Sequence, residues 1–218
     1  IVIVRRNKYI WYQFPFMFKR LLFFFIFSTS FVSAQIDYSD SWEDFFSYNN
    51  VKDFVKVDNM LYALSDNAIF TYDVTTQEIE KLSSVQGLSG ETTSAIHYSI
   101  ETNRLVIGYE NGLIEVVDSD GSITISADIV SFNQTGEKSI NDIFEYQGKL
   151  YLSTSFAIVE YDITELEFGD TFFIGNNSTD VSINEIAVFN DRIYAATENG
   201  IFYADSNNPN LIDFNNWN

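Results

Sequence analysis

The chain has 218 residues, of which 46% are hydrophobic, and this is enough length and apolar content to bury a packed core. Its 12 lysines and arginines stand against 31 aspartates and glutamates, and every acidic residue lies after residue 35. Because so acidic a surface repels phosphates, we expect no nucleic acid partner. The absence of cysteine excludes disulfides, thiolate metal sites and a cysteine nucleophile.

Residues 17–34 have the three parts of a secretory signal peptide. Met17 opens a short basic stretch, residues 21–32 form an apolar run, and Ala34 ends a small-residue cleavage motif before Gln35. We expect export through the Sec pathway, with cleavage between Ala34 and Gln35. The alternative is an uncleaved membrane anchor, but a spanning helix needs about 20 apolar residues.

Residues 1–16 begin without methionine and contain three basic residues. We interpret them as upstream sequence that takes no part in the fold. Residues 35–218 then form the mature chain, which has seven basic against 31 acidic residues, a balance of −24. This negative charge favours solubility outside the cell.

One strand-like pattern recurs four times, at spacings of 44, 45 and 43 residues. Each copy is preceded by one strand-like run and followed by two, with Asn, Asp and Gly between them, which is typical of hairpin-linked strands. Four short antiparallel strands at this period predict a blade of a β-propeller. The recurring positions that we expect in the core between blades are Leu61, Tyr62, Leu105, Tyr109, Leu150, Tyr151, Ile193 and Tyr194.

The predicted fold class is therefore all-β, a partial β-propeller of about four four-stranded blades. We place the blades near residues 51–82, 94–127, 141–174 and 183–214. We expect their first strands to begin at residues 53, 95, 143 and 186, and the last strands of the third and fourth blades to cover residues 172–174 and 211–214. Because the chain ends inside a recurring unit, we expect it to be a fragment of a larger ring.

No motif in the chain predicts catalysis, a cofactor or a resident metal. His97 is the single histidine, and without a G-x-S-x-G motif it gives no hydrolase triad, so we expect it to pack in a strand or form a simple hydrogen bond. The loop at residues 118–121 has aspartates like a calcium loop, but it lacks the first ligand and flanking helices. We interpret it as a hairpin turn, with a weak surface calcium site as the alternative.

Two segments resemble the PorZ family of the type IX secretion system of Bacteroidetes. Residues 85–90, 96–98 and 105–114 are similar to a blade of that family, and residues 41–50 are similar to its opening segment after the signal peptide. The same blade is similar to the propeller repeat of two-component regulators, whose usual Trp-Ile-Gly-Thr is replaced here by residues 106–109. That difference favours PorZ over a sensor.

The resemblance implies a non-enzymatic cell-surface protein that is associated with the outer membrane. Its family has two N-terminal propellers and a small C-terminal β domain, and it belongs to the complex that removes cargo sorting signals and attaches cargo to anionic lipopolysaccharide. The implied partners are other proteins of that complex and, through a C-terminal domain that we expect to lie outside this fragment, the lipopolysaccharide. The alternatives are a periplasmic location, the extracellular sensor propeller of a hybrid two-component system and, third, a secreted propeller glycoside hydrolase.

Overall fold

A computed structural model describes residues 45–218, which belong to one compact unit. The predicted signal peptide, its cleavage point between Ala34 and Gln35, and residues 1–16 lie outside the described residues. No helix in the part of the chain that the structure describes has the length and apolar content needed to cross a membrane.

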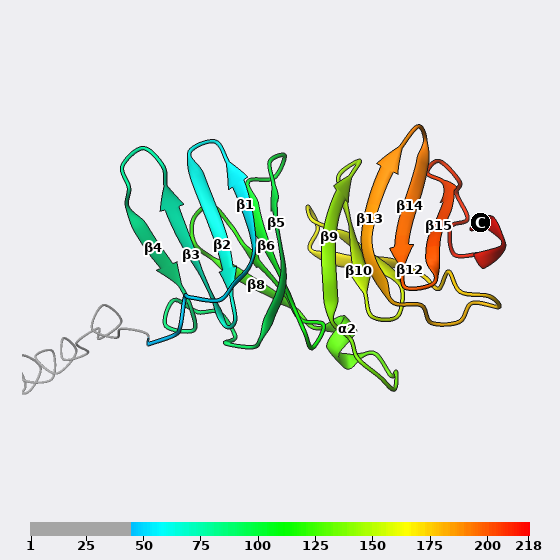
Figure 1. Ribbon diagram of the computed structural model, residues 1–218, viewed down its shortest axis with the longest axis horizontal. Coiled ribbons are helices and arrows are strands. Elements are labelled where there is room, and N and C mark those ends of the chain that lie inside the picture. Colours follow the sequence, from blue (N-terminus) through cyan, green and yellow to red (C-terminus); the bar gives the residue numbers. More distant parts are fainter. Residues whose placement is uncertain (1–44) are drawn as a thin grey trace, which may run out of the picture. The chain divides into compact units, whose positions relative to one another are not determined.

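The described residues form four antiparallel sheets in chain order (Figure 1). The first two sheets consist of β1 (Val51–Val57), β2 (Met60–Ser65), β3 (Ala68–Asp73), β4 (Ile79–Leu82), β5 (Thr93–Ser99), β6 (Arg104–Tyr109), β7 (Ile114–Val117) and β8 (Ile123–Ser126). The other two consist of β9 (Ile140–Tyr146), β10 (Lys149–Thr154), β11 (Ile158–Asp162), β12 (Glu167–Phe172), β13 (Ile183–Phe189), β14 (Arg192–Thr197) and β15 (Gly200–Asp205). A short helix, α2 (Asp128–Ser131), lies between β8 and β9.

Each sheet is a simple meander, and the first strand of each sheet contacts the first strand of the next. β1 contacts β5, β5 contacts β9, and β9 contacts β13. Four-stranded meanders whose first strands line a common axis are the blades of a β-propeller. The predicted fold class is confirmed, and we number the blades 1 to 4 in chain order.

Three apolar clusters fill the spaces between neighbouring blades. Leu64 and Ile107 belong to the cluster between blades 1 and 2, Val106 and Leu150 to the cluster between blades 2 and 3, and blades 3 and 4 share a third. Alternate residues of one strand point to opposite faces of its sheet, so consecutive residues such as Val106 and Ile107 serve two different seams. This is why the central strands are almost continuously apolar.

The first strand of every blade begins two or three residues earlier than predicted, at positions 51, 93, 140 and 183. The reason is a β-bulge near the start of each first strand, at which the pairing register shifts. The extra residues of the bulges are Lys52, Ser94, Asn141 and Asn184. A bulge adds one residue and interrupts the alternation of side chains, so the sequence pattern does not reveal this part of the strand.

The predicted last strands of blades 3 and 4 are wrong. β12 covers Glu167–Phe172 rather than residues 172–174, because its edge residues are mostly polar and exposed. Residues 211–214 form no strand, and a 3₁₀ turn covers Phe214–Asn216. Asn218 instead exchanges two backbone hydrogen bonds with Tyr203 of β15, which is the pairing of a fourth antiparallel strand.

Candidate functional site

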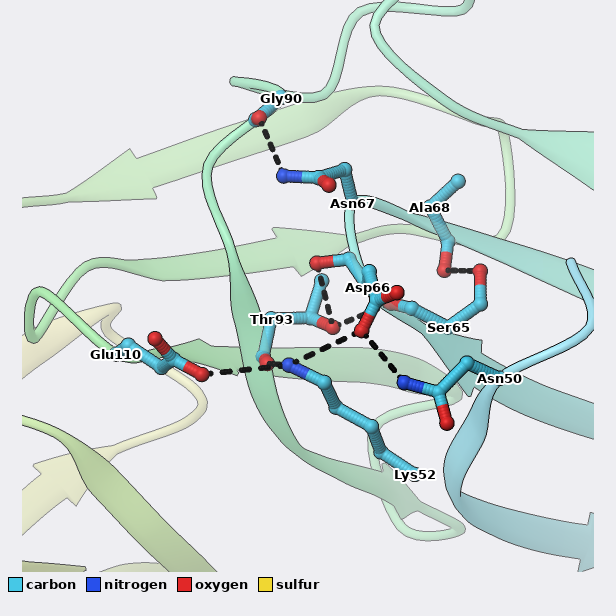
Figure 2. Close-up of polar contacts among 9 residues, drawn as sticks. All are labelled: Asn50, Lys52, Ser65, Asp66, Asn67, Ala68, Gly90, Thr93 and Glu110. Atoms are coloured by element: carbon cyan, nitrogen blue, oxygen red, sulfur yellow. Dashed lines mark hydrogen bonds and ion pairs between the residues drawn. The ribbon is translucent and has the colours of Figure 1, made fainter. Parts of the chain in front are cut away.

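A lysine ammonium group joins blades 1 and 2 at the start of their first strands (Figure 2). The Nζ atom of Lys52 donates to the carbonyl oxygen of Thr93 at 2.8 Å. It also forms ion pairs with Glu110 at 3.3 Å and Asp66 at 3.6 Å. Asn50 donates to the same carboxylate of Asp66. The side chain of Lys52 is 24% exposed, so these acceptors replace part of its water.

The same contact recurs between blades 3 and 4. Asn141 occupies the bulge position of β9, as Lys52 does in β1, and its Nδ2 atom donates to the carbonyl oxygen of Ile183 at 2.7 Å. The acceptors Thr93 and Ile183 are themselves equivalent, since each is the first residue of the next blade's first strand. A side chain at the bulge thus fixes the following blade.

Blade 2 breaks this pattern because its bulge residue is Ser94. The Oγ atom of Ser94 is buried and has no hydrogen-bond partner. A serine side chain is one atom shorter than asparagine and offers a single donor, so it does not form the contact that Asn141 forms. The seam between blades 2 and 3 lacks this hydrogen bond.

Replacing Ser94 by asparagine is expected to add the missing hydrogen bond, from its amide to the carbonyl of Ile140, and to raise the free energy of unfolding by about 1 kcal/mol. Urea unfolding checks this. Ser94→Ala is the matched control, and it is expected to change stability by less than about 0.5 kcal/mol. A Ser94→Asn variant less stable than the alanine control would show that the seam has no room for the longer side chain.

Three polar side chains meet across the opposite end of the seam between blades 2 and 3. The Nε2 atom of His97 on β5 lies 2.8 Å from Oε2 of Glu145 on β9. Ser99, also on β5, donates from Oγ to Oε1 of the same carboxylate at 2.9 Å. The side chains of His97 and Glu145 are 22% and 18% exposed. The hydrogen bond expected for His97 is thus a link between two blades.

Two members of this cluster, His97 and Glu145, line a groove of about 590 Å³. We call it the hairpin groove, because it lies between the β5–β6 turn and the β9–β10 turn. Its walls are made by His97, Tyr98, Ile100, Glu101, Glu145 and Tyr146. Its volume lies in the range of about 300 to 1,000 Å³ that is typical of ligand sites, so the hairpin groove is one candidate binding site of this chain.

A carboxylate with no exposed surface lies in blade 2. Glu115 of β7 accepts a hydrogen bond from the backbone N–H of Ser89 at 2.8 Å and another from the hydroxyl of Tyr109. Burial, followed by the hydrogen bond to Glu115, raises the pKa of Tyr109 far above its usual range, so its hydroxyl remains a donor. Glu115 thereby fixes the loop at residues 85–90, one of the segments that carries the family resemblance.

Asp142, next to the bulge of β9, is a partly buried acid. Burial raises its pKa, with smaller contributions from Glu185 and Asp53, although hydrogen bonds from Ile143 and Ile186 favour the charged form. Because the folded pKa lies above the unfolded one, the folded state binds the proton more tightly. Stability therefore falls as the pH rises through the window between the two pKa values, and the charged carboxylate destabilises the fold above it.

Asp142→Asn is accordingly expected to raise Tm at pH 7, by about 2 °C. The gain should shrink as the pH is lowered and disappear below about 3.9, the ordinary pKa of aspartate. Differential scanning calorimetry from pH 3 to 7 measures this. Asp53→Asn, at the equivalent but exposed position of β1, is expected to show a much smaller change. A gain of equal size at all pH values would contradict the electrostatic explanation.

Six of the eight recurring positions belong to the apolar clusters between blades, and Leu61 and Tyr194 do not. Leu105, Tyr109, Leu150, Tyr151 and Ile193 are at most 7% exposed, whereas Leu61, Tyr62 and Tyr194 are half-buried. Tyr62 stacks on Tyr98 of blade 2, with ring centroids 5.3 Å apart. Tyr194 packs beside Tyr203 on the face of blade 4 that lies away from blade 3.

The other two segments singled out in the sequence, the aspartate loop at residues 118–121 and the opening segment, both have a structural role. The loop at residues 118–121 is the turn between β7 and β8, in which Asp118 pairs with Arg104 at 2.7 Å. Within residues 45–218, no three histidine, aspartate or glutamate side chains are grouped closely enough to hold a metal ion.

In the opening segment, Tyr48 packs edge-on against Phe70, with ring centroids 6.0 Å apart. Asn50 of the same segment binds Asp66, so this segment is attached to blade 1.

The sequence analysis missed that the residue at the bulge, Lys52 or Asn141, donates a hydrogen bond to the next blade. The sequence nevertheless contains a signal for this contact. Blades 3 and 4 both begin with Ser-Ile-Asn, then an acid, then Ile, at residues 139–143 and 182–186. Recurrence of Asn at one position of a repeat indicates a side-chain contact rather than a turn. The equivalent residues in blades 1 and 2, Lys52 and Ser94, hide the pattern.

The comparison with family models decides the family. The model of the PorZ N-terminal β-propeller domain of the type IX secretion system matches residues 61–218. This chain belongs to the PorZ N-terminal β-propeller family. The resemblance of residues 85–90, 96–98 and 105–114 to this family is thereby confirmed. No match was found among curated proteins.

Solved structures show the same propeller fold. PorZ of Porphyromonas gingivalis, described as an essential surface component of its type IX secretion system, is 20% identical with a TM-score of 0.69, and the match covers 81% of this chain and 23% of that chain. The extracellular domain of a one-component system from B. thetaiotaomicron is 15% identical with a TM-score of 0.59, covering 74% and 22%. Sqt1 of Saccharomyces cerevisiae is 19% identical with a TM-score of 0.59, covering 75% and 48%. The chain spans less than a quarter of the PorZ chain that it matches.

Proposed function

We propose that this chain is part of a non-catalytic binding module of the type IX secretion machinery. The observation that carries the proposal is the match of the PorZ propeller model to residues 61–218. A propeller of rigid blades presents loops and grooves at its two ends, which suits it to holding partner proteins.

The polar geometry supports binding rather than hydrolysis. Ser99 donates its hydroxyl proton to Glu145 and not to His97, so the serine and the histidine do not form a nucleophile and base pair. Tyr109 and Glu115 are fully buried and cannot reach a substrate. Among the described residues, these are the polar clusters closest in type to catalytic ones.

The finer role that we propose is support of cargo sorting at the outer surface of the outer membrane. In this role the module contacts other proteins of the attachment complex, and conjugation of cargo to anionic lipopolysaccharide depends on that complex. Export through the Sec pathway, directed by residues 17–34, would bring the protein to that location. The negative charge of the mature chain is consistent with contacts to proteins rather than to anionic glycans themselves.

Cross-linking on intact cells tests the proposed partners. The gene is tagged in the bacterium that encodes it, the cells are treated with a membrane-impermeant cross-linker, and cross-linked peptides are identified by mass spectrometry. We expect cross-links to proteins of the secretion attachment complex. A protein that is accessible but cross-linked only to a membrane histidine kinase would refute the proposal.

A second candidate function is the extracellular sensor propeller of a regulatory system. It is favoured by the similarity of the fold to the one-component system domain of B. thetaiotaomicron. The sequence match to the PorZ family ranks it second. A sensor predicts that deleting the gene changes transcription of a defined set of genes while secreted cargo is processed normally.

A further inference from the structure

The tripeptide Glu-Asn-Gly occurs twice in the chain, at residues 110–112 and 198–200. Each copy lies at the turn between the second and third strands of its blade, β6 and β7 in blade 2 and β14 and β15 in blade 4. An asparagine that precedes glycine is prone to cyclise, because glycine has no side chain to hinder the approach of its nitrogen. Since the three residues are the same, a difference in reactivity between the two copies must come from the fold around them.

The reaction is an intramolecular displacement, with water as the other reactant. The glycine backbone nitrogen loses its proton to hydroxide and attacks Cγ of the asparagine. The new N–Cγ bond replaces the Cγ–Nδ2 bond, and the amide nitrogen takes a proton from water and leaves as ammonia. Water then opens the cyclic imide at one of its two carbonyls, which gives aspartate or isoaspartate. The net change replaces NH₂ by OH and adds one negative charge at neutral pH.

The turn in blade 2 holds both reacting groups in place. The Oδ1 atom of Asn111 accepts a hydrogen bond from the backbone N–H of Leu113 at 3.0 Å. The attacking nitrogen, that of Gly112, donates to the carbonyl oxygen of Tyr109 at 3.0 Å. Gly112 is also buried, and a Cβ atom built on it would lie 2.5 Å from Cγ2 of Ile129. Cyclisation here requires two hydrogen bonds to break inside a packed segment.

The glutamates of the two tripeptides differ in the same way. Glu110 forms an ion pair with Lys52 at 3.3 Å, and its backbone N–H donates to the carbonyl oxygen of Thr92 at 2.9 Å. Glu198 is exposed and has no ion pair within residues 45–218. The start of the turn is therefore fixed in blade 2 and exposed to water in blade 4.

The turn in blade 4 leaves the asparagine amide unengaged. Asn199 and Gly200 are both exposed, and the hydroxyl of Thr197 accepts from the Asn199 N–H at 3.1 Å and donates to the Gly200 carbonyl at 2.9 Å. Both of these hydrogen bonds are exposed, and the Asn199 side chain forms none with the described residues. A Cβ atom on Gly200 would meet nothing within 4 Å, so the backbone has room to rotate. Gly200 pairs with Thr197 as the last pair of the hairpin, and such terminal pairs open at little cost.

We propose that Asn199 is a site of spontaneous covalent modification to isoaspartate and aspartate, whereas Asn111 in the same tripeptide is protected by the fold. Isoaspartate lengthens the main chain of the two-residue β14–β15 turn by one atom, and the new carboxylate lies next to Glu198. The tip of this hairpin therefore becomes longer and more negative as the protein ages. The proposal is independent of the secretion role.

Incubation of the folded protein in mildly alkaline buffer made with water labelled with heavy oxygen tests this. Carboxylates formed during the incubation carry the label, and those formed during a later digestion at acid pH do not. Mass spectrometry with electron-transfer fragmentation measures the labelled product at each site and distinguishes isoaspartate from aspartate. The same incubation in concentrated urea gives the two rates without the fold. Asn199→Gln is the control for assignment, because glutamine would need a larger and more slowly formed ring. Thr197→Val removes the two hydrogen bonds of the hydroxyl from the turn in blade 4.

In the folded protein, Asn199 is expected to react at least about 10-fold faster than Asn111, and in urea the two rates should agree within about 3-fold. Asn199→Gln should abolish the label at this position only, and Thr197→Val should speed the reaction at Asn199 without changing that at Asn111. Equal rates in the folded protein, or a faster reaction at Asn111, would overturn the proposal. The same ratio of rates in urea as in the folded protein would overturn it too, because the difference would then arise from the sequence and not from the fold.

Discussion

Replacing Glu115 by alanine is expected to lower the free energy of unfolding by about 3 kcal/mol. Glu115 has no exposed surface and is the acceptor for both the Ser89 N–H and the Tyr109 hydroxyl. Its removal leaves two donors without their acceptor and opens a cavity beneath the loop at residues 85–90. Chemical denaturation measures the free energy of unfolding, and hydrogen exchange of the Ser89 amide measures how often the loop at residues 85–90 opens.

Two further variants separate the hydrogen bonds from packing. Positions equivalent to Glu115 in the other blades are apolar: Phe70, Val159 and Phe202. Glu115→Leu restores this packing and is expected to recover part of the stability but not the protection of the Ser89 amide. Glu91→Ala, an exposed change in the same connection, is expected to cost less than about 0.5 kcal/mol. Loss of less than 1 kcal/mol in Glu115→Ala would contradict the role assigned to this carboxylate.

Replacing Gly108 by alanine is expected to destabilise the seam between blades 2 and 3 by about 2 kcal/mol. A Cβ atom at this position would lie 2.8 Å from Cγ2 and 3.0 Å from Cβ of Ile140, closer than packed atoms approach. Ile140 is fully buried in the cluster between these blades and has little room to move. Blades 2 and 3 must therefore separate slightly, or β9 must shift.

A double-mutant cycle tests the steric cause. Ile140→Ala alone is expected to cost about 2–5 kcal/mol through the cavity that it leaves. Because that cavity accepts the added methyl group, the double variant Gly108→Ala with Ile140→Ala should be more stable than the sum of the single effects, by about 1 kcal/mol. Thermal unfolding of the four proteins gives the coupling. Strict additivity would mean that the two residues are not in steric contact.

The repeat could be predicted from the sequence because apolar alternation and turn residues recur together. The second strands at Leu61, Leu105, Leu150 and Ile193 lie in the middle of their sheets, where burial on both faces makes the pattern strong. The starts of the first strands could not be predicted, because the bulges at Lys52, Ser94, Asn141 and Asn184 break the alternation.

The candidate site was less predictable than the fold. His97 and Glu145 are 48 residues apart in the sequence, and nothing in either local pattern links them. Their contact arises because β5 and β9 are adjacent first strands in the propeller. Glu115 is fully buried in β7, and nothing in the local sequence distinguishes it from the exposed acids of other hairpins. Contacts between blades depend on how neighbouring repeats stack. The sequence of a single repeat does not show which of its residues will meet those of the next.

The fate of secreted cargo tests the central claim most directly. The gene is deleted in the bacterium that encodes this chain, and the C-termini of secretion cargo are measured by quantitative mass spectrometry in periplasmic and surface fractions, with the complemented strain as control. A binding module of the type IX machinery predicts cargo that retains its C-terminal signal and accumulates in the periplasm, with recovery on complementation. Normally processed cargo on the surface of the deletion strain would contradict the proposed function.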